Sequence, residues 1–414
     1  MYDFIVALIW ASAGFFVLLM LLILVNKAWR EVAERRLRKR RVQLEPIFFR
    51  YVTGTGPIEE HLKQPLRPSD RVLVEEIFFD LGRVVKGSVW ERAREAFERL
   101  GFVDHYISRL QSRGWWYRAE AAEKLGYIGS ERGTQPLVKH MDDPVGEVRV
   151  RVARALGRIG TPEALDYLVE ALRDPGRWSA IRVGGILINA GEGGVERLMK
   201  AYATLPFHAR VAAIDIFARI RSLKASPLLL ELLEDENSDI RARAAFALGA
   251  TGDPNFAEPL IGALKDPAWA VRAMAAKAVG RLKEAASIPT LCECLQDAEW
   301  WVRANAAEAL KNKGEKGSQA LLGMLESDDT YAAQQAVQML QESGSLDGMI
   351  AQLGSPDKGE RQASLEFMAR LVMLRRTDLL TEMALNHPEA SIRERLSIVL
   401  GLRRPTAWQH QVMT

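Results

Sequence analysis

A stretch of thirteen residues, IRARAAFALGATG, recurs in varied form along this chain and constrains the fold more than any other feature. It begins at Ile240, and close copies begin at Tyr117, Val148, Val271 and Val302. The residue near the end of each copy, usually a leucine, returns every 28 to 32 positions: Leu125, Leu156, Leu187, Phe217, Leu248, Val279, Leu310, Leu340, Met368 and Leu400. Such a period is typical of a stacked array in which each unit packs only against its neighbours.

Each unit reads as a helical hairpin. At Gly252-Asp253-Pro254, the glycine can end one helix in the left-handed conformation, the aspartate can cap the next helix and the proline can take its first position. The second helix of four units carries a pair of alanines, which are small enough to let neighbouring helices approach closely: Ala121-Ala122, Ala244-Ala245, Ala275-Ala276 and Ala306-Ala307.

The sequence therefore predicts an all-α protein, an α-solenoid of about ten to twelve hairpins preceded by one transmembrane helix. Only 8% of the residues are aromatic, and the abundance of Ala, Leu, Arg and Glu favours helices over strands. Five regions are expected: an anchor at 1–26, a basic juxtamembrane helix and neck at 27–68, degenerate cap repeats at 69–114, the solenoid at 115–402 and a tail at 403–414.

The anchor is predicted from 22 uncharged residues, Phe4–Val25, which as a helix cross a hydrocarbon core of about 30 Å. A cleaved signal peptide is the alternative, but the apolar run is long and Met1-Tyr2-Asp3 contains no basic residue. Residues 1–41 hold eight Lys and Arg against three Asp and Glu, a net charge of +5 that leaves −2 for the rest of a chain of net charge +3. A near-neutral body argues against nucleic-acid binding, which needs a continuous basic face.

The basic residues that follow the span predict a single-pass membrane protein with its N-terminus outside and its solenoid in the cytoplasm. The same side chains are candidates for contact with anionic lipid headgroups, and a topology signal alone is the alternative. They are Lys27, Arg30, Arg35, Arg36, Arg38, Lys39, Arg40 and Arg41.

The segments Asp239–Gly252 and Asp266–Leu282 nearly spell out the pattern D-x-x-x-V-R-x-x-A-A-x-A-L-G-x-I-G. Through this pattern the chain resembles the HEAT-repeat superfamily, in particular the short bacterial repeats called phycobilisome-lyase-like, over about residues 115 to 402. The resemblance implies a solenoid that docks partners and fixes no single activity. Some HEAT-like enzymes hold two irons through His-Glu pairs, but no His here is followed by Glu, and no chromophore-binding feature of the bilin lyases is recognisable.

An arginine opens the second helix of most units and predicts a ladder along one ridge: Arg118, Arg149, Arg210, Arg241, Arg272, Arg303, Arg361 and Arg393. Asp239, Asp266 and Asp297 stand a few residues before three of these arginines and are the expected ion-pair partners, which favours a structural role. Binding of an acidic partner is the alternative. Ala180 and Ala333 replace the arginine in two units.

Large aromatic residues precede the ladder by two or three positions: Trp115, Trp116, Trp178, Phe207, Trp269, Trp300, Trp301 and Tyr331. Because they hold nearly the same place in successive units, we expect them to line one edge of the solenoid. Aromatic residues are favoured anchors at protein interfaces. Packing of each ring on the turn of the next repeat is the alternative.

Catalysis finds little support in the sequence. The six histidines show no metal-ligand spacing, so neither an enzyme nor a metal or cofactor site is expected. Cys292 and Cys294 are expected to be ordinary buried or half-buried residues, since they lie on different sides of a predicted helix.

These features and the resemblance predict a scaffold anchored in a bacterial inner membrane. It would dock a membrane-associated protein partner through the eight aromatic residues above or through the concave face of the second helices. Bacterial membrane HEAT proteins that accompany envelope or exopolysaccharide glycosyltransferases look similar in layout, which implies that pathway. A regulatory subunit of a membrane enzyme or signalling complex is the alternative, and nucleic-acid binding or independent catalysis is the least expected.

Overall fold

The computed structural model describes residues 2–54, 56–58, 62, 66–67, 70–84, 87–373 and 377–402, without the side chains of 2, 3, 5–9, 11–13, 33, 82–84 and 377–379. The predicted tail at 403–414 and parts of the predicted neck therefore lie outside the described residues. Contacts divide the chain into two compact units, Met1–Tyr167 and Leu168–Thr414. Every regular element in the described ranges is a helix, which confirms the all-α solenoid prediction.

The first unit begins with a single long helix. Its elements are α1 (Tyr2–Thr53), α3 (Asp70–Val84), α4 (Ser88–Arg99), α5 (Phe102–Arg109), α6 (Trp115–Ile128), η1 (Glu131–Gly133), α7 (Thr134–Val138) and α8 (Gly146–Ile159), and α9 (Pro162–Ala171) spans the boundary between the units. Within the predicted juxtamembrane helix and neck at 27–68, α1 continues through Pro46 to Thr53, so the neck begins only after Thr53. Its last turns pack against α3 and α4, and this burial of Leu44 and Phe48 explains why the helix continues.

An aromatic cluster holds this end of α1 on the cap helices. The ring of Phe78 lies 4.8 Å from that of Phe48 and 4.8 Å from that of Phe97. The guanidinium of Arg92 lies over the ring of Tyr51 and donates hydrogen bonds of 2.9 and 3.0 Å to its carbonyl oxygen. The cap region is therefore a packed subdomain around the base of α1.

The predicted anchor is part of α1. Among the residues that the structure describes, no helix has the length and the uninterrupted apolar character needed to cross a bilayer. The side chains of residues 5–9 and 11–13, inside the predicted span Phe4–Val25, lie outside the described set. The span therefore stays a prediction.

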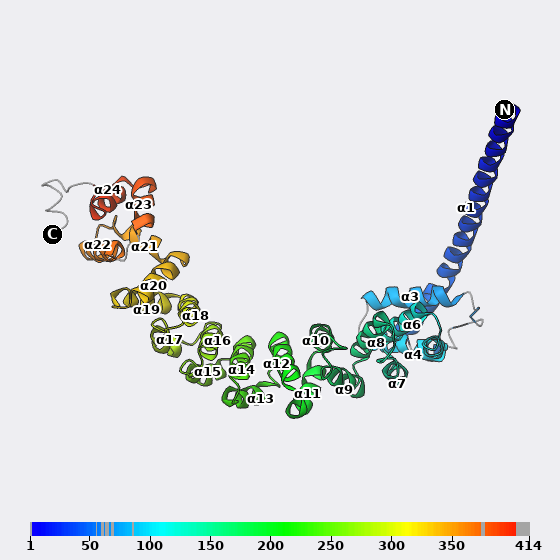
Figure 1. The fold of residues 1–414 in the computed structure, drawn as a ribbon, viewed down its shortest axis with the longest axis horizontal. Helices are drawn as coiled ribbons and strands as arrows, with labels where there is room; N and C mark the ends of the chain where they lie inside the picture. The colour runs from blue at the N-terminus through cyan, green and yellow to red at the C-terminus, as the bar shows by residue number, and fades with distance from the viewer. Residues whose placement is uncertain are drawn as a thin grey trace. The chain divides into compact units, whose positions relative to one another are not determined.

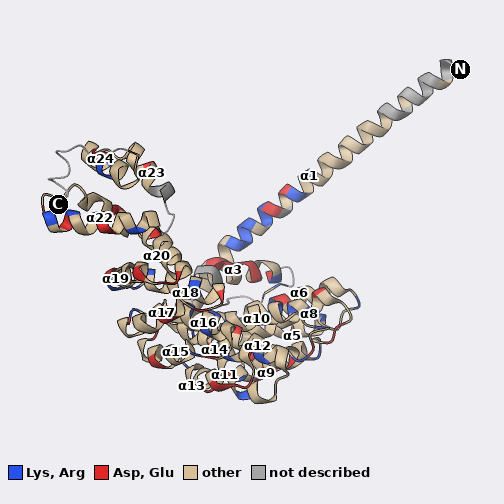
Figure 2. Cartoon of the chain, turned by 60° about the vertical axis from the view of Figure 1, so that its left-hand side comes forward, with Lys and Arg blue, Asp and Glu red and all other residues tan. Residues whose placement is uncertain are grey.

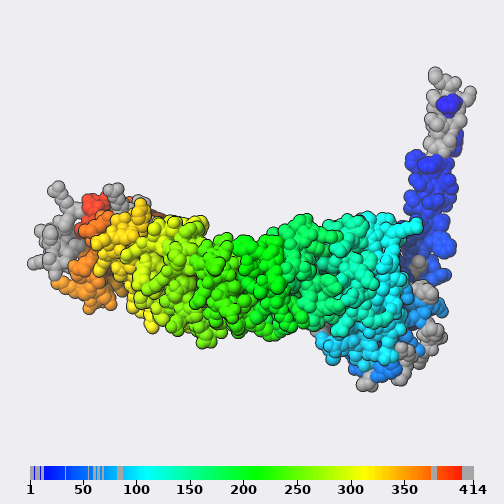
Figure 3. All heavy atoms as spheres, turned by 60° about the horizontal axis from the view of Figure 1, so that its bottom comes forward, coloured from blue at the N-terminus to red at the C-terminus, as the bar shows by residue number. Residues whose placement is uncertain are grey.

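The second unit is a stack of hairpins. Its elements are α10 (Ala180–Asn189), α11 (Glu192–Ala201), η2 (Tyr202–Thr204), α12 (Phe207–Ile220), α13 (Ser226–Glu231), η3 (Leu232–Glu234), α14 (Ser238–Thr251), η4 (Pro254–Phe256), α15 (Ala257–Ala263), α16 (Trp269–Val279), η5 (Ala285–Ser287), α17 (Ile288–Cys294), α18 (Trp300–Lys311), α19 (Glu315–Gly323), η6 (Met324–Glu326), α20 (Thr330–Glu342), α21 (Ser345–Gln352), α22 (Lys358–Met373), α23 (Thr377–Asn386) and α24 (Ala390–Val399). From α10 to α20, each even-numbered helix packs against the next. Figure 1 shows these helices on the concave side of the unit and the odd-numbered helices on its convex side. The atoms of successive repeats lie against one another along this unit (Figure 3).

Glycine sets the spacing between neighbouring even-numbered helices. A Cβ atom on Gly249 of α14 would lie 2.5 Å from the Cα atom of Ala278 in α16, and Gly280 meets Ala309 of α18 in the same way at 2.9 Å. The predicted alanine pairs are fully buried as well, and at these two glycines the next helix leaves no room for a side chain.

Candidate protein-interaction surfaces

Most of the predicted aromatic residues lie in the first turn of even-numbered helices, because each stands at or just after the residue where its helix begins. Seven of them are between 43% and 67% exposed: Trp115, Trp116, Phe207, Trp269, Trp300, Trp301 and Tyr331. Trp178 differs, since it precedes α10 and is only 8% exposed. The expectation that Trp178 belongs to the exposed row is therefore not met.

The aromatic row is most continuous over α16, α18 and α20, which pack side by side. Trp269, Trp300 and Tyr331 stand at the start of these three helices, and the rings of Trp300 and Trp301 meet edge to face with centroids 4.7 Å apart. We call the four residues Trp269, Trp300, Trp301 and Tyr331 the aromatic edge. Exposed aromatic side chains in such a group offer large contact area at little cost in conformational entropy.

The arginine ladder forms clamps within and between repeats. Arg241 donates bonds of 2.8 and 3.0 Å to the carboxylate of Asp266, and its third nitrogen donates to the carbonyl oxygen of Asp235 at 2.8 Å. Arg272 binds Asp297 and Arg118 binds Asp143 in the same bidentate way. The carboxylate comes from the turn 25 residues further along the chain, so the expected pairing with the preceding aspartate is wrong.

Four further ladder arginines bind the backbone carbonyl oxygens but, within the described ranges, no carboxylate of the following repeat. Their guanidinium groups donate to carbonyl oxygens five and six residues earlier: Arg149, Arg303, Arg361 and Arg393. Arg210 is the exception, because its buried Nε atom has no hydrogen-bond partner among the described residues. The other four arginines thus tie the start of a helix to the turn before it.

The aspartates of the clamps are stabilised as carboxylates. Burial alone would raise the pKa of Asp266, but hydrogen bonds from Arg241 and from the backbone N–H of Ala268 outweigh it and hold this pKa below the ordinary value. The pKa values of Asp143 and Asp297 are lowered by the same balance. Both partners of each clamp are therefore charged, and the carboxylate oxygens accept hydrogen bonds from the arginine. This is the geometry of a structural ion pair.

The basic residues after the predicted span divide into two groups. Arg40 binds Asp70 of α3, with its closest bond at 2.8 Å, and Arg41 binds Asp80 at 2.6 Å, so these two candidates hold α1 to the cap. The others are exposed on α1: Lys27, Arg30, Arg35, Arg36, Arg38 and Lys39. Figure 2 shows charged residues, coloured blue and red, along the part of α1 nearer to α3 and residues without charge, coloured tan, further along the helix.

The cysteines and acidic residues show no constellation for chemistry in the described part of the chain. Cys292 is half-buried and Cys294 is buried, and burial raises the pKa of the Cys294 thiol to about 12. No group of three or more His, Cys, Asp or Glu lies close enough to hold a metal ion within the described residues.

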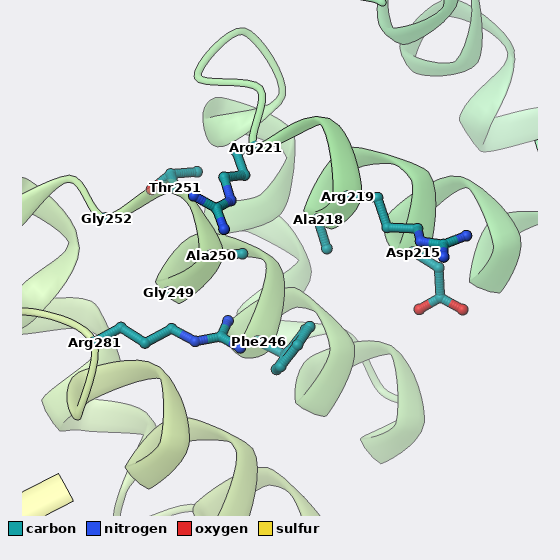
Figure 4. A pocket seen from close by; sticks show the side chains of 10 residues that line it. All are labelled: Asp215, Ala218, Arg219, Arg221, Phe246, Gly249, Ala250, Thr251, Gly252 and Arg281. Carbon is teal, nitrogen blue, oxygen red and sulfur yellow. The ribbon is translucent and has the colours of Figure 1, made fainter. Parts of the chain in front are cut away.

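The second unit contains a cavity that the sequence did not predict. This cavity of about 780 Å³ opens between the C-terminal ends of α12, α14 and α16, lined by Asp215, Ala218, Arg219, Arg221, Phe246, Gly249, Ala250, Thr251, Gly252 and Arg281. Figure 4 shows the guanidinium groups of Arg221 and Arg281 pointing into the same space from different sides. A signal was present in the sequence, because Arg221 occupies the position after the second helix where other units have glycine.

The fold and these surfaces define a class of protein: a helical-repeat solenoid with exposed aromatic side chains at the helix starts and internal arginine clamps. The sequence profile of HEAT repeats matches residues 103–183, 195–267 and 257–341, more than half of the chain. The chain belongs to the HEAT-repeat family.

Similar proteins include a HEAT repeat-containing taxis protein of Halobacterium salinarum, 40% identical over 88 residues, which are 21% of this chain and 19% of that protein. The phycocyanobilin lyase subunit alpha of a Picosynechococcus species is 27% identical over 175 residues, 42% of this chain and 58% of that subunit. The chain thus matches less than two thirds of the length of either relative. A solved structure of the karyopherin Kap121p, bound to the extreme C-terminus of the phosphatase Cdc14p, aligns with 90% of this chain and 51% of that chain at 14% identity and a TM-score of 0.42.

Proposed function

We propose that this protein is a membrane-anchored adaptor whose HEAT-repeat solenoid docks a protein partner at the cytoplasmic face of a bacterial inner membrane. The aromatic edge carries the proposal. Soluble proteins rarely expose several large aromatic rings side by side, and such groups mark interaction sites. Three packed helices hold these rings in place, so a partner meets a rigid surface.

The anchoring part of the proposal is supported by α1. Its large apolar side chains are exposed at every position from Phe15 to Val25, and water solvates such a surface poorly. Exposed cations follow on the same helix, beginning with Lys27 and Arg30, in the order that places the following domain in the cytoplasm. The six exposed cations of α1 would meet anionic lipid headgroups, whereas Arg40 and Arg41 are engaged with α3.

The proposed partner is a membrane enzyme, and the resemblance to HEAT proteins that accompany envelope or exopolysaccharide glycosyltransferases suggests its class. A regulatory subunit of a signalling complex is the second candidate. The similarity to a taxis protein over 88 residues favours it, because taxis is a signalling process. In both cases the solenoid binds and positions a protein and catalyses no reaction itself.

A pull-down tests the adaptor. The full-length protein and a variant with Trp269→Ala, Trp300→Ala and Trp301→Ala are purified from detergent-solubilised membranes, and co-purifying proteins are identified by mass spectrometry. The control variant carries Tyr127→Ala and Tyr167→Ala, which remove exposed rings outside the edge. We expect a membrane protein that is lost only from the tryptophan variant, with helicity unchanged.

Two results would refute the proposal. Recovery of the protein in the soluble fraction, without a membrane extraction step, would contradict the anchor. The same partners in all three samples would show that the aromatic edge is not the contact surface.

A further inference from the structure

The cavity between α12, α14 and α16 holds positive charge that the protein does not neutralise. Three guanidinium groups line it, those of Arg219, Arg221 and Arg281, and none of them lies within ion-pair distance of a carboxylate in the described ranges. The lining contains one carboxylate, Asp215, which already accepts bonds of 2.7 and 2.8 Å from Arg243. The ladder arginines Arg241 and Arg272 lie in the same helices but are paired with the carboxylates of Asp266 and Asp297. The three arginines of the cavity therefore form a separate group without ion-pair partners among the residues that the structure describes.

Arg221 adopts a backbone conformation that residues other than glycine rarely adopt. It follows α12 with φ of 58° in the left-handed region, and in the described chain it is the one residue other than glycine with positive φ. The equivalent residues after α8 and α14 are Gly160 and Gly252, which adopt this conformation without steric cost. Strained residues of this kind gather at functional sites, where a side chain is needed despite the cost to the backbone.

Arg281 is held toward the cavity by packing. Its guanidinium lies 4.5 Å from the ring centroid of Phe246, which also lines the cavity. Burial and the neighbouring charge of Arg221 lower the pKa of Arg281. An anion placed between the two arginines would relieve this repulsion, and two planar guanidinium groups can each bind a carboxylate through two parallel hydrogen bonds.

The positively charged surface around the cavity is short, and this limits the kind of anion that can bind there. The nearby cations of α14 and α16 are Arg243, which is half exposed, and Lys277, which is exposed. The next helix, α18, presents Asn305 and Glu308, and Asn312 follows its last residue. A nucleic-acid backbone needs a longer basic track. A short stretch of carboxylates matches the charge and the open shape of the cavity better.

We propose that this cavity binds a carboxylate-rich peptide segment of the docked protein, with Arg221 and Arg281 as its anchoring cations and Arg219 at the rim. The inference rests on the proposed function in that it names the chemistry of the partner. The aromatic edge and the cavity would then be two contact sites on one solenoid, one apolar and one for anions.

Binding of a defined probe tests the proposal. The probe is a fluorescein-labelled peptide of about twelve residues alternating Glu and Ser, which reaches about 40 Å when extended and can cross three packed helices. The full-length protein in detergent is titrated by fluorescence anisotropy, beside the variant Arg221→Gly/Arg281→Ala. A control variant, Lys265→Ala/Lys316→Ala, loses the same charge from exposed positions at or near α15 and α19. A Gln-Ser peptide and an oligothymidylate of similar length are the control probes.

We expect the Glu-Ser peptide to bind at least about tenfold more weakly to Arg221→Gly/Arg281→Ala and with unchanged affinity to the lysine control. The single variant Arg221→Gly should weaken binding while its urea midpoint stays equal to or above that of the wild type, because glycine relieves the backbone. A lower midpoint with unchanged binding would show that Arg221 only caps α12 and would overturn the proposal.

Other outcomes also overturn it: equal loss in the lysine control, no binding of the Glu-Ser peptide above that of the Gln-Ser peptide, or tighter binding of the oligothymidylate. Two results distinguish failure of the proposed adaptor function from failure of the proposed cavity site. A pull-down without a partner, while the peptide still binds in the cavity, contradicts the adaptor alone. A partner retained by Arg221→Gly/Arg281→Ala contradicts the cavity as its contact site and leaves the adaptor standing.

Discussion

Truncating Arg241 tests whether the clamps between repeats hold the solenoid together. The side chains of Arg241 and Asp266 are 15% and 11% exposed, so water replaces little of the interaction when it is broken. The change Arg241→Ala removes two charge-assisted bonds to the carboxylate and two bonds to the carbonyl oxygens of Asp235 and Glu236. It also leaves the carboxylate of Asp266 partly buried without its cation.

The magnitude follows from these contacts. Charge-assisted hydrogen bonds contribute about 1.5 to 3 kcal/mol each, and removing one partner of a buried pair costs about 3 to 5 kcal/mol. With a discount for the remaining exposure, we expect Arg241→Ala to lower the free energy of unfolding by about 3 kcal/mol. The matched control is Arg243→Ala, whose pair with Asp215 is 42% and 52% exposed and should contribute less than about 1 kcal/mol.

Urea unfolding followed by circular dichroism measures both variants, and hydrogen exchange in α14 and α16 shows whether the loss is local, since repeat arrays can unfold in parts. A double-mutant cycle with Asp266→Ala isolates the pair and should give a coupling energy of about 2 kcal/mol. Equal effects of Arg241→Ala and Arg243→Ala, or a coupling energy near zero, would refute the view that the clamps stabilise contacts between repeats.

Two further predictions concern the same stack. The pKa of Asp266 is lowered in the folded state, so the clamp's contribution is fully present above the ordinary value of 3.8 and disappears as the pH falls through the folded value. Asp266→Asn should therefore lower the urea midpoint at pH 7, and its difference from the wild type should disappear as the pH falls through the folded pKa of Asp266; a constant difference at all pH values would contradict this. Gly249→Ala should cost about 2 kcal/mol, because its Cβ atom would lie 2.4 Å from that of Ala278, whereas Gly262→Ala in α15 has open space and should be neutral or slightly stabilising. Equal thermal midpoints for the two glycine variants would show that helix spacing adapts freely.

Some of the architecture was readable from the sequence because it depends on neighbouring residues. Helical periodicity, the glycine after a helix and the recurrence of one motif are local properties, and they predicted the hairpins and their stacking from Ile240 and its copies. The helix starts were less accurate: the arginines were expected to open the second helices, but α16 begins at Trp269 and α18 at Trp300, so the aromatic residues lie in the first turns.

Other features were decided by contacts between residues far apart in the chain. The partner of Arg241 is Asp266 and not Asp239, because stacking brings the turn of the following repeat to the guanidinium group. The helix α1 continues to Thr53, since α3 and α4 cover its last turns. Trp178 is buried although its spacing matches that of exposed tryptophans.

The cavity depends most on tertiary structure. Arg221 and Arg281 are sixty residues apart, and they share one space only because α12, α14 and α16 end side by side. The sequence determined the repeat unit, since a helix forms from interactions within a few residues of each other. Tertiary packing decided which charges are paired and which stay open, because that depends on which side chains of adjacent repeats come within bonding distance.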